Sequence, residues 1–166
     1  MNIPAFPKNL SSLTHKMMAL YGLPHLVHSM VVLPLVLFVP SYYADDLGLP
    51  LASVGAAIAA SRFLDIFIDP IMGILSDRWQ TRWGRRKPWL VIGTPFLLLS
   101  TWMVFVPRET VSVFYLLIWS SLLFLAFTVF DLPYKAWGAE LSTDYNERSR
   151  IAAWREAFGA SGHILF

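Results

Sequence analysis

Cysteine is absent from this chain of 166 residues. Its absence excludes disulfide bonds, thiol chemistry and any metal site built on cysteine ligands. Charged residues are also scarce, since they form 14% of the chain, against about 25% in soluble globular domains. Hydrophobic residues form 56% of the chain and occur in long blocks, and the mean hydropathy is +0.54. This balance indicates an integral membrane protein.

Motifs typical of enzymes are lacking as well. The sequence contains no paired nucleophile and base, no metal-ligand spacing such as His-Glu-x-x-His, and no nucleotide-binding loop. We therefore expect neither an enzyme nor a cofactor, and no nucleic-acid partner is indicated. A cleavable signal peptide is not expected either, because the polar residues 1–16 precede an apolar run longer than a signal-peptide core.

Long apolar runs divide the chain into membrane spans. A spanning helix needs about 20 mostly apolar residues. Four segments meet this requirement, at residues 17–44, 51–76, 89–106 and 111–134. A fifth begins near residue 150 and is still apolar at residue 166. Because no loop closes it, we expect an all-α membrane protein that is incomplete, either a truncated product or a fragment.

Cations in the loops indicate how the spans are oriented. Five lie between the second and third spans, namely Arg78, Arg82, Arg85, Arg86 and Lys87. The preceding loop contains Asp45 and Asp46 and no cation. Since lysine and arginine accumulate in cytoplasmic loops, we expect residues 1–16 to form a cytoplasmic segment of a plasma (inner) membrane protein. The basic loop has a simpler alternative role, as a topology marker that contacts anionic lipids.

Three charged residues interrupt the second span near its middle. They are Arg62, Asp65 and Asp69, and helical spacing places all three on one face. A charge at that depth costs about 2.5–3.5 kcal/mol on insertion scales. One arginine balances only one aspartate, so a surplus carboxylate remains for a cation or a proton. The alternative is an ion cluster that only neutralises itself.

The same stretch carries a longer pattern. It reads Asp-x-x-x-Asp-Pro-x-x-Gly, then Asp-Arg, then Trp-Gly-x-x-Lys-Pro-Trp, between residues 65 and 89. This pattern resembles the second helix and following loop of the glycoside–pentoside–hexuronide:cation symporters, the melibiose permease-like members of the major facilitator superfamily. The resemblance implies twelve helices in two halves, of which this chain supplies the first four to five. It also implies symport of a sugar or glycoside with H⁺ or Na⁺ by alternating access.

The resemblance assigns roles to individual residues. Asp65 and Asp69 match carboxylates of the coupling-cation site, and they would hold the metal ion if the cation is Na⁺. Arg62 matches an arginine near the sugar pocket. Asp131, in the sequence Asp-Leu-Pro-Tyr, matches a sugar-binding aspartate. The implied partners are the substrate, the lipid bilayer and a C-terminal half of the same protein.

Other substrate-site positions depart from the family pattern. Ser29 stands where melibiose permease has an aspartate used for both sugar and cation. Lys135 replaces a tryptophan, although Trp137 follows two residues later. A sugar-site arginine aligns with Glu156, so Arg155 is a candidate only if the register slips by one residue. These departures indicate a substrate other than melibiose.

Two histidines near the serine bear on the coupling ion. His25 and His28 lie in the same span as Ser29, and imidazole can titrate near physiological pH. Together with the missing aspartate, they favour H⁺ over Na⁺. Helix packing or interfacial hydrogen bonding is the alternative role for each histidine.

The loop after the second span resembles the cytoplasmic motif of the superfamily. In that motif a glycine permits close helix approach, and a charge network latches the two halves of the transporter together. The matching residues here are Gly73, Asp77, Arg78, Gly84 and Arg85.

Two other functions remain open from the sequence. A lipid or lysolipid carrier of the same fold would line spans one, two and four with apolar side chains, which Arg62 and Asp131 argue against. A membrane scaffold without transport activity would tolerate replacement of Asp65 or Asp69 by asparagine. The sequence leaves open which sugar is carried and which cation drives it.

Overall fold

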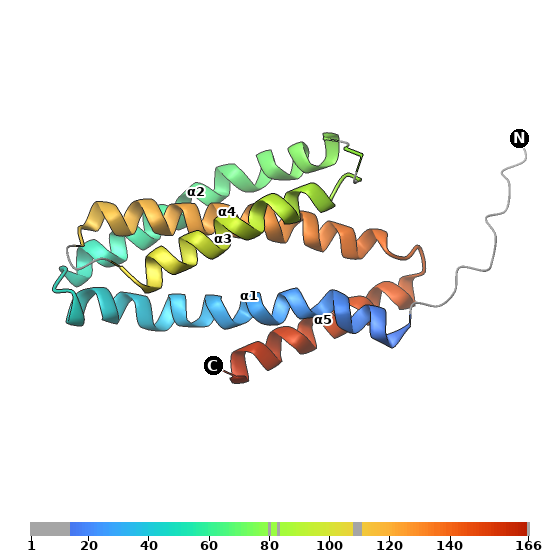
Figure 1. The fold of residues 1–166 in the computed structure, drawn as a ribbon, viewed down its shortest axis with the longest axis horizontal. Coiled ribbons are helices and arrows are strands. Elements are labelled where there is room, and N and C mark those ends of the chain that lie inside the picture. The colour runs from blue at the N-terminus through green and yellow to red at the C-terminus, as the bar shows by residue number, and fades with distance from the viewer. Residues whose placement is uncertain (1–13, 80, 83, 108–110, 166) are drawn as a thin grey trace, which may run out of the picture.

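The computed structural model describes residues 14–79, 81–82, 84–107 and 111–165. Every regular element in this described part is helical, and Figure 1 shows the helices running along one common direction. Their order is α1 (His15–Ser41), a π-helical segment η1 (Tyr42–Asp46), α2 (Leu51–Arg78), α3 (Lys87–Phe105), α4 (Val113–Glu140) and α5 (Tyr145–Leu165). The cytoplasmic segment expected at residues 1–16 lies almost entirely outside the described residues.

Four segments of the described chain are long and apolar enough to cross a membrane. They are His15–Asp46, Leu51–Arg78, Lys87–Phe105 and Val113–Glu140. This confirms the expected all-α, multi-pass membrane fold. α5 starts at Tyr145, before the expected position, because Asp144 caps it by accepting a hydrogen bond of 3.0 Å from the backbone N–H of Glu147.

Glycine allows the chain to turn at two helix connections. Gly48, with φ of +70°, separates η1 from α2, and Gly84, with φ of +97°, closes a tight turn before α3. Other residues rarely adopt these angles. In the second turn, the backbone N–H of Gly84 donates to the carbonyl of Thr81 at 3.0 Å, and the Thr81 hydroxyl donates to the carbonyl of Gly84 at 2.8 Å. The basic connection between α2 and α3 therefore contains a tight, hydrogen-bonded turn.

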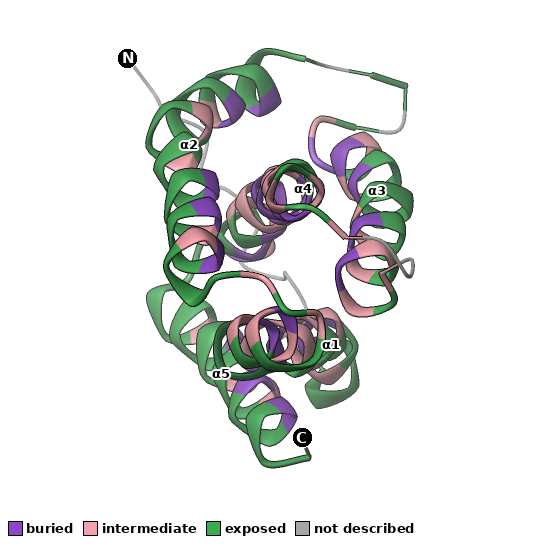
Figure 2. Cartoon of the chain, turned by 90° about the vertical axis from the view of Figure 1, so that its left-hand side faces the viewer, coloured by how far each residue is buried: buried purple, intermediate pink, exposed green. Residues whose placement is uncertain are grey.

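α4 is the central helix of the bundle. Figure 2 shows it between α2 and α3, and its most extensive contacts are with these two helices. α1 packs along α5 below them. In Figure 1 the α2–α3 and α4–α5 connections lie at the same end of the bundle as the start of α1.

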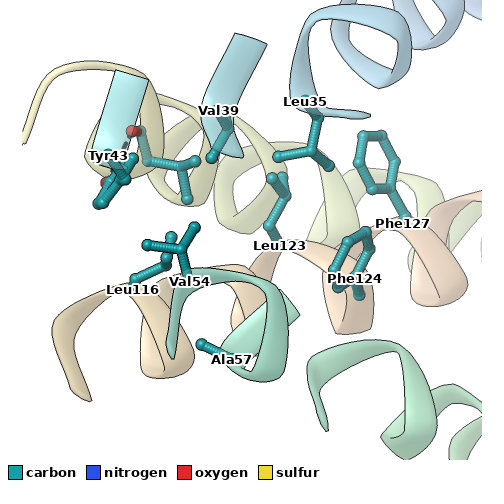
Figure 3. Packing of buried hydrophobic residues seen from close by; sticks show 10 residues of the cluster. Leu35, Val39, Tyr43, Val54, Ala57, Leu116, Leu123, Phe124 and Phe127 are labelled. Carbon is teal, nitrogen blue, oxygen red and sulfur yellow. Dashed lines mark hydrogen bonds between the residues drawn. The ribbon is translucent and has the colours of Figure 1, made fainter. Parts of the chain in front are cut away.

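The larger apolar core lies where η1, the start of α2 and the start of α4 meet, and Figure 1 shows these segments at the end of the bundle opposite the basic connection. Leu35 of α1, Tyr43 of η1, Val54 of α2 and Leu123 of α4 meet in it and are almost fully buried (Figure 3). The Tyr43 hydroxyl donates a hydrogen bond of 2.9 Å to the carbonyl of Val104, which ties η1 to the end of α3. This core fixes α2 against α4 on one side of the charged residues at the middle of α2.

Polar contacts also hold the helices together. The hydroxyl oxygens of Ser61 on α2 and Ser120 on α4 are 2.7 Å apart. On the far side of the bundle, the rings of Tyr21 and Tyr134 stack with centroids 4.6 Å apart, and each hydroxyl donates to the backbone carbonyl of the other residue. Such interhelical bonds stabilise helix packing in membranes, where the hydrophobic effect contributes little.

Glycines bring α1 and α5 close together. A Cβ atom added to Gly162 would lie 2.5 Å from the backbone oxygen of Leu26, and one added to Gly22 would lie 2.5 Å from the ring of Phe158. Neither distance is sterically possible. Small residues at such crossings allow the backbones of membrane helices to pack in direct contact.

Candidate functional site

A cavity of about 270 Å³ lies between α1, α2 and α4, halfway along the bundle. Its polar lining consists of His28, Arg62, Asp65, Asp69, Thr128, Asp131 and Lys135. The bundle thus gathers the three charged residues of α2 and the two of α4 around one space, as expected from their shared helix faces. Three carboxylates and two basic groups in one cavity suit a polar or charged ligand.

The two aspartates of α2 differ in their surroundings. Asp69 accepts a hydrogen bond of 2.9 Å at Oδ1 from the hydroxyl of Thr128 on α4. Asp65 lies one turn earlier, and its Oδ1 atom is buried without a hydrogen-bond partner among the described residues. A buried carboxylate oxygen without a partner is costly. Binding of a proton or a cation is therefore most favourable at Asp65.

Arg62 does not neutralise these aspartates directly. Its Cζ atom stands 4.0 Å above the ring centre of Phe124 on α4, a cation–π contact. Within the described residues no ion pair joins Arg62 to Asp65 or Asp69. The self-neutralising ion cluster considered from the sequence is thus not formed in this arrangement.

Asp131 and Lys135 form an ion pair on α4. The distance from Lys135 Nζ to Asp131 Oδ2 is 2.6 Å, at the i,i+4 spacing that the sequence indicated. The Lys135 side chain is 47% exposed, whereas that of Asp131 is 18% exposed. The lysine can therefore swing away more easily than the aspartate, and the pair can open to admit a ligand.

Two predicted substrate residues lie elsewhere. Ser29 is buried against α5, where a Cβ atom added to Gly162 would lie 3.0 Å from its Cβ, and it does not line the cavity. Arg155 lines a separate cavity of about 230 Å³, which it shares with Lys135. Its guanidinium is 2.6 Å from Oε1 of Glu156. Of the residues that line the central cavity, Arg155 shares its own cavity with Lys135. On α1, His28 lines the central cavity and Ser29 does not.

A second charged cluster lies at the end of the bundle with the basic connection. Arg86 Nη2 is 2.6 Å from Oδ1 of Asp77 and 2.9 Å from Oε1 of Glu140, and Nη1 donates to the Ser76 hydroxyl at 3.1 Å. Arg85 Nη2 reaches the same Glu140 oxygen at 2.6 Å. Arg86 is almost buried and joins α2, the connection and α4. We call these five residues the Arg86 network.

The Arg86 network differs in membership from the predicted latch. Asp77 and Arg85 belong to it, and Gly84 forms the turn beside it. Arg78 is exposed and forms no ion pair within the described residues, while a Cβ atom added to Gly73 would meet open space. Arg86, Glu140 and Ser76 were missed. Glu140 was detectable in principle, because it is an acid that ends the fourth span on the same side as the basic loop.

Comparison with known proteins places the chain in a family. The profile described as MFS/sugar transport protein matches residues 20–166. The chain belongs to this family. This confirms the family resemblance found in the sequence.

Three relatives illustrate the range of the family. An uncharacterized symporter of Synechocystis is 37% identical over 79% of this chain. A protein of Escherichia coli, named provisionally as a glycoside/cation symporter, is 30% identical over 93% of the chain. The sodium-dependent lysophosphatidylcholine symporter 1 of Gallus gallus is 30% identical over 77% of the chain. The chain spans 26%, 34% and 25% of the lengths of these relatives.

Proposed function

We propose that this chain is the N-terminal part of a cation-coupled symporter that carries a sugar or glycoside by alternating access. The observation that carries the proposal is the cavity in which Asp65 keeps an unpaired buried oxygen beside the anchored Asp69. A coupling ion relieves that unpaired charge. The family description and the named glycoside/cation relative support the substrate class.

The cation acts on the free energy of closing the cavity. With Asp65 and Asp69 both ionised, a closed cavity of low dielectric holds a net negative charge near Arg62, which is costly. H⁺ or Na⁺ bound at these carboxylates lowers that cost, and their oxygens are suitable ligands for Na⁺. The halves then rock about the site and expose it to the other side.

The sugar is held on the α4 side of the cavity. Asp131 accepts hydrogen bonds from sugar hydroxyls once Lys135 moves aside, and Lys135 and Arg62 donate to the remaining hydroxyl oxygens. Sugar and cation favour each other's binding because they share one cavity, and this mutual effect must be equal in both directions. Ser29 and Arg155 then act at the edge of the site or on the packing of α5.

The membrane placement completes the proposal. Residues 1–16 and the Arg86 network lie on the cytoplasmic side of a plasma membrane, in agreement with the cations of the α2–α3 connection. The Arg86 network, with Gly73 and Gly84, latches the cytoplasmic side against a C-terminal half. The partners are the substrate, the bilayer and that second half.

A lysolipid carrier of the same fold is less well supported. The avian relative is named for such a cargo, yet the central cavity here is lined by five ionisable residues of α2 and α4. The larger apolar cavity, of about 440 Å³, lies apart from them and is lined by residues such as Met17, Leu20 and Trp137.

Uptake assays on the complete transporter that contains this chain test the proposal. Cells producing it are given radiolabelled melibiose, lactose, xylose or lysophosphatidylcholine, with and without a Na⁺ or pH gradient. We expect gradient-dependent uptake of a sugar, and its loss in Asp131→Asn. Uptake of the lysolipid alone would support the alternative, and a protein that reaches the membrane but moves no cargo would be a scaffold.

A further inference from the structure

Two histidines of α1 lie side by side at the edge of the cavity. The rings of His25 and His28 are stacked, with centroids 5.5 Å apart and planes 11° apart. His28 lines the charged cavity together with Asp131, and its ring packs edge-on against Phe127 at a centroid distance of 4.7 Å. His25 lies one turn earlier, where its Nε2 atom is 3.9 Å from Oε2 of Glu156 on α5. The pair therefore links the cavity to a carboxylate outside it.

α5 is shaped to admit the His25 ring. A Cβ atom added to Gly159 would lie 2.7 Å from Cδ2 and 2.9 Å from Nε2 of His25, so any larger residue there displaces the ring. The Nδ1 atom of His25 is buried and has no hydrogen-bond partner among the described residues. Buried polar atoms are rarely left unpaired, and an exception calls for an explanation such as a functional role or a bound water.

Charged groups from three helices face the histidine pair. They are Arg62, Asp65 and Asp69 on α2, Asp131 and Lys135 on α4, and Arg155, Glu156 and His163 on α5. The four carboxylates outnumber the three lysine and arginine groups. One carboxylate of this set is therefore left without a lysine or arginine to balance it.

We propose that His25 and His28 form the proton-carrying pair of this transporter, which makes H⁺ the coupling ion. The proton is then held on His28, in the cavity that Asp65 and Asp69 also line, and it offsets their negative charge from there instead of binding to a carboxylate oxygen. This inference rests on the proposed symport function. Imidazole is the side chain that changes charge in the physiological pH range. When His28 is protonated, its imidazolium competes with Lys135 for the Asp131 carboxylate. Proton binding thereby changes the availability of Asp131, the group that receives the sugar. This couples proton binding to sugar binding.

The proton balance is simple. A proton from water on the outer side forms an N–H bond on the unprotonated ring nitrogen of His28. After the cavity has opened to the cytoplasm and the sugar has left, the same N–H bond breaks and the proton passes to water there. His25 stacks on His28 and lies between it and the carboxylate of Glu156. No other bond is made or broken.

Proteoliposomes containing the complete transporter test the pair. Accumulation of radiolabelled melibiose, lactose or xylose is driven by a pH gradient without Na⁺, and sugar exchange at equal concentrations is measured in parallel. We expect His28→Gln to abolish accumulation above the external sugar concentration, because a carrier without a coupled proton can only equalise the two sides. Exchange, which needs no net proton movement, continues. His15→Gln is the matched control, since His15 lies at the start of α1 beside Arg150.

The outcomes distinguish a failure of the histidine-pair proposal from a failure of the proposed symport function. Unchanged gradient-driven accumulation in His28→Gln, or accumulation in the wild type driven only by Na⁺, overturns the histidine pair and leaves symport standing. A wild type that moves no sugar overturns the proposed function itself. If His28→Gln does not reach the membrane, Gly159→Ala displaces His25 without removing an ionisable group. Its pH profile of accumulation is expected to shift, and an unshifted profile contradicts the proposal.

Discussion

The hydroxyl of Thr128 on α4 donates a hydrogen bond of 2.9 Å to Oδ1 of Asp69 on α2. This bond crosses the interface between the two helices that form most of the cavity. It holds one carboxylate of the proposed cation site in place, while the oxygen of Asp65 one turn earlier stays without a partner. The site thus combines a fixed ligand with an unsatisfied one.

Replacement of Thr128 by valine removes this donor and nearly preserves the shape of the side chain. A hydrogen bond to a charged group contributes about 1.5–3 kcal/mol, so we expect the apparent affinity for the coupling cation to fall about tenfold or more. Cation dependence of sugar uptake measures the change. Thr94→Val is the control, because the Thr94 hydroxyl is exposed and donates within its own helix, to the carbonyl of Leu90. Equal effects of both substitutions would contradict a role for Thr128.

Lys135 is expected to control the ligand selectivity of Asp131. Lys135→Gln removes the cation that lies 2.6 Å from Asp131 Oδ2, and the aspartate becomes free to accept hydrogen bonds. We expect the substitution to keep transport and to change the ranking of sugars in competition assays. A ranking identical to that of the wild type would mean that the ion pair does not border the sugar.

The Arg86 network predicts different effects for two neighbouring arginines. Arg86 bridges Asp77, Glu140 and Ser76, which needs the fork of a guanidinium, whereas the ion pair of Arg85 within the described residues is with Glu140. Arg86→Lys therefore keeps the charge but loses part of these contacts, which we expect to cost about 0.5–1.5 kcal/mol, the usual net contribution of a hydrogen bond. Arg85→Lys has little effect. Thermal unfolding of the purified transporter in detergent distinguishes them, and equal melting temperatures would contradict the network.

The α1–α5 crossing predicts a difference between two glycines. A methyl group at Gly162 would meet the backbone oxygen of Leu26 at 2.5 Å, and only a shift of a helix relieves this contact. A methyl group at Gly55 on α2 meets nothing within 4 Å. Gly162→Ala should lower the melting temperature and the yield of folded protein, and Gly55→Ala should not. A stable Gly162→Ala protein would show that α1 and α5 pack less closely.

Much of the fold could be predicted from the sequence, because the membrane constrains the length of each span and the placement of the charged residues. The face shared by Arg62, Asp65 and Asp69 followed from helical spacing, and the Asp131–Lys135 pair from its i,i+4 separation. The bond from Thr128 to Asp69 was not predictable in this way. It depends on the packing of α4 against α2, which no local pattern specifies.

The same reason explains the other differences. Ser29 and His28 are adjacent in the sequence. Ser29 faces the helix interface, where it contacts the glycines of α5, while His28 faces the cavity. Glu140 joins the Arg86 network because the ends of α2 and α4 are neighbours in space. Contacts between distant segments are fixed by side-chain packing, so they became visible only in the structure.

The central claim is that the unpaired carboxylate of Asp65 couples a cation to sugar transport. The most direct measurement is sugar accumulation against a gradient, compared with sugar exchange, in proteoliposomes that contain Asp65→Asn. The account predicts that cation-driven accumulation is lost while exchange continues, because asparagine preserves the shape and removes the charge that the cation neutralises. Accumulation equal to that of the wild type would contradict it.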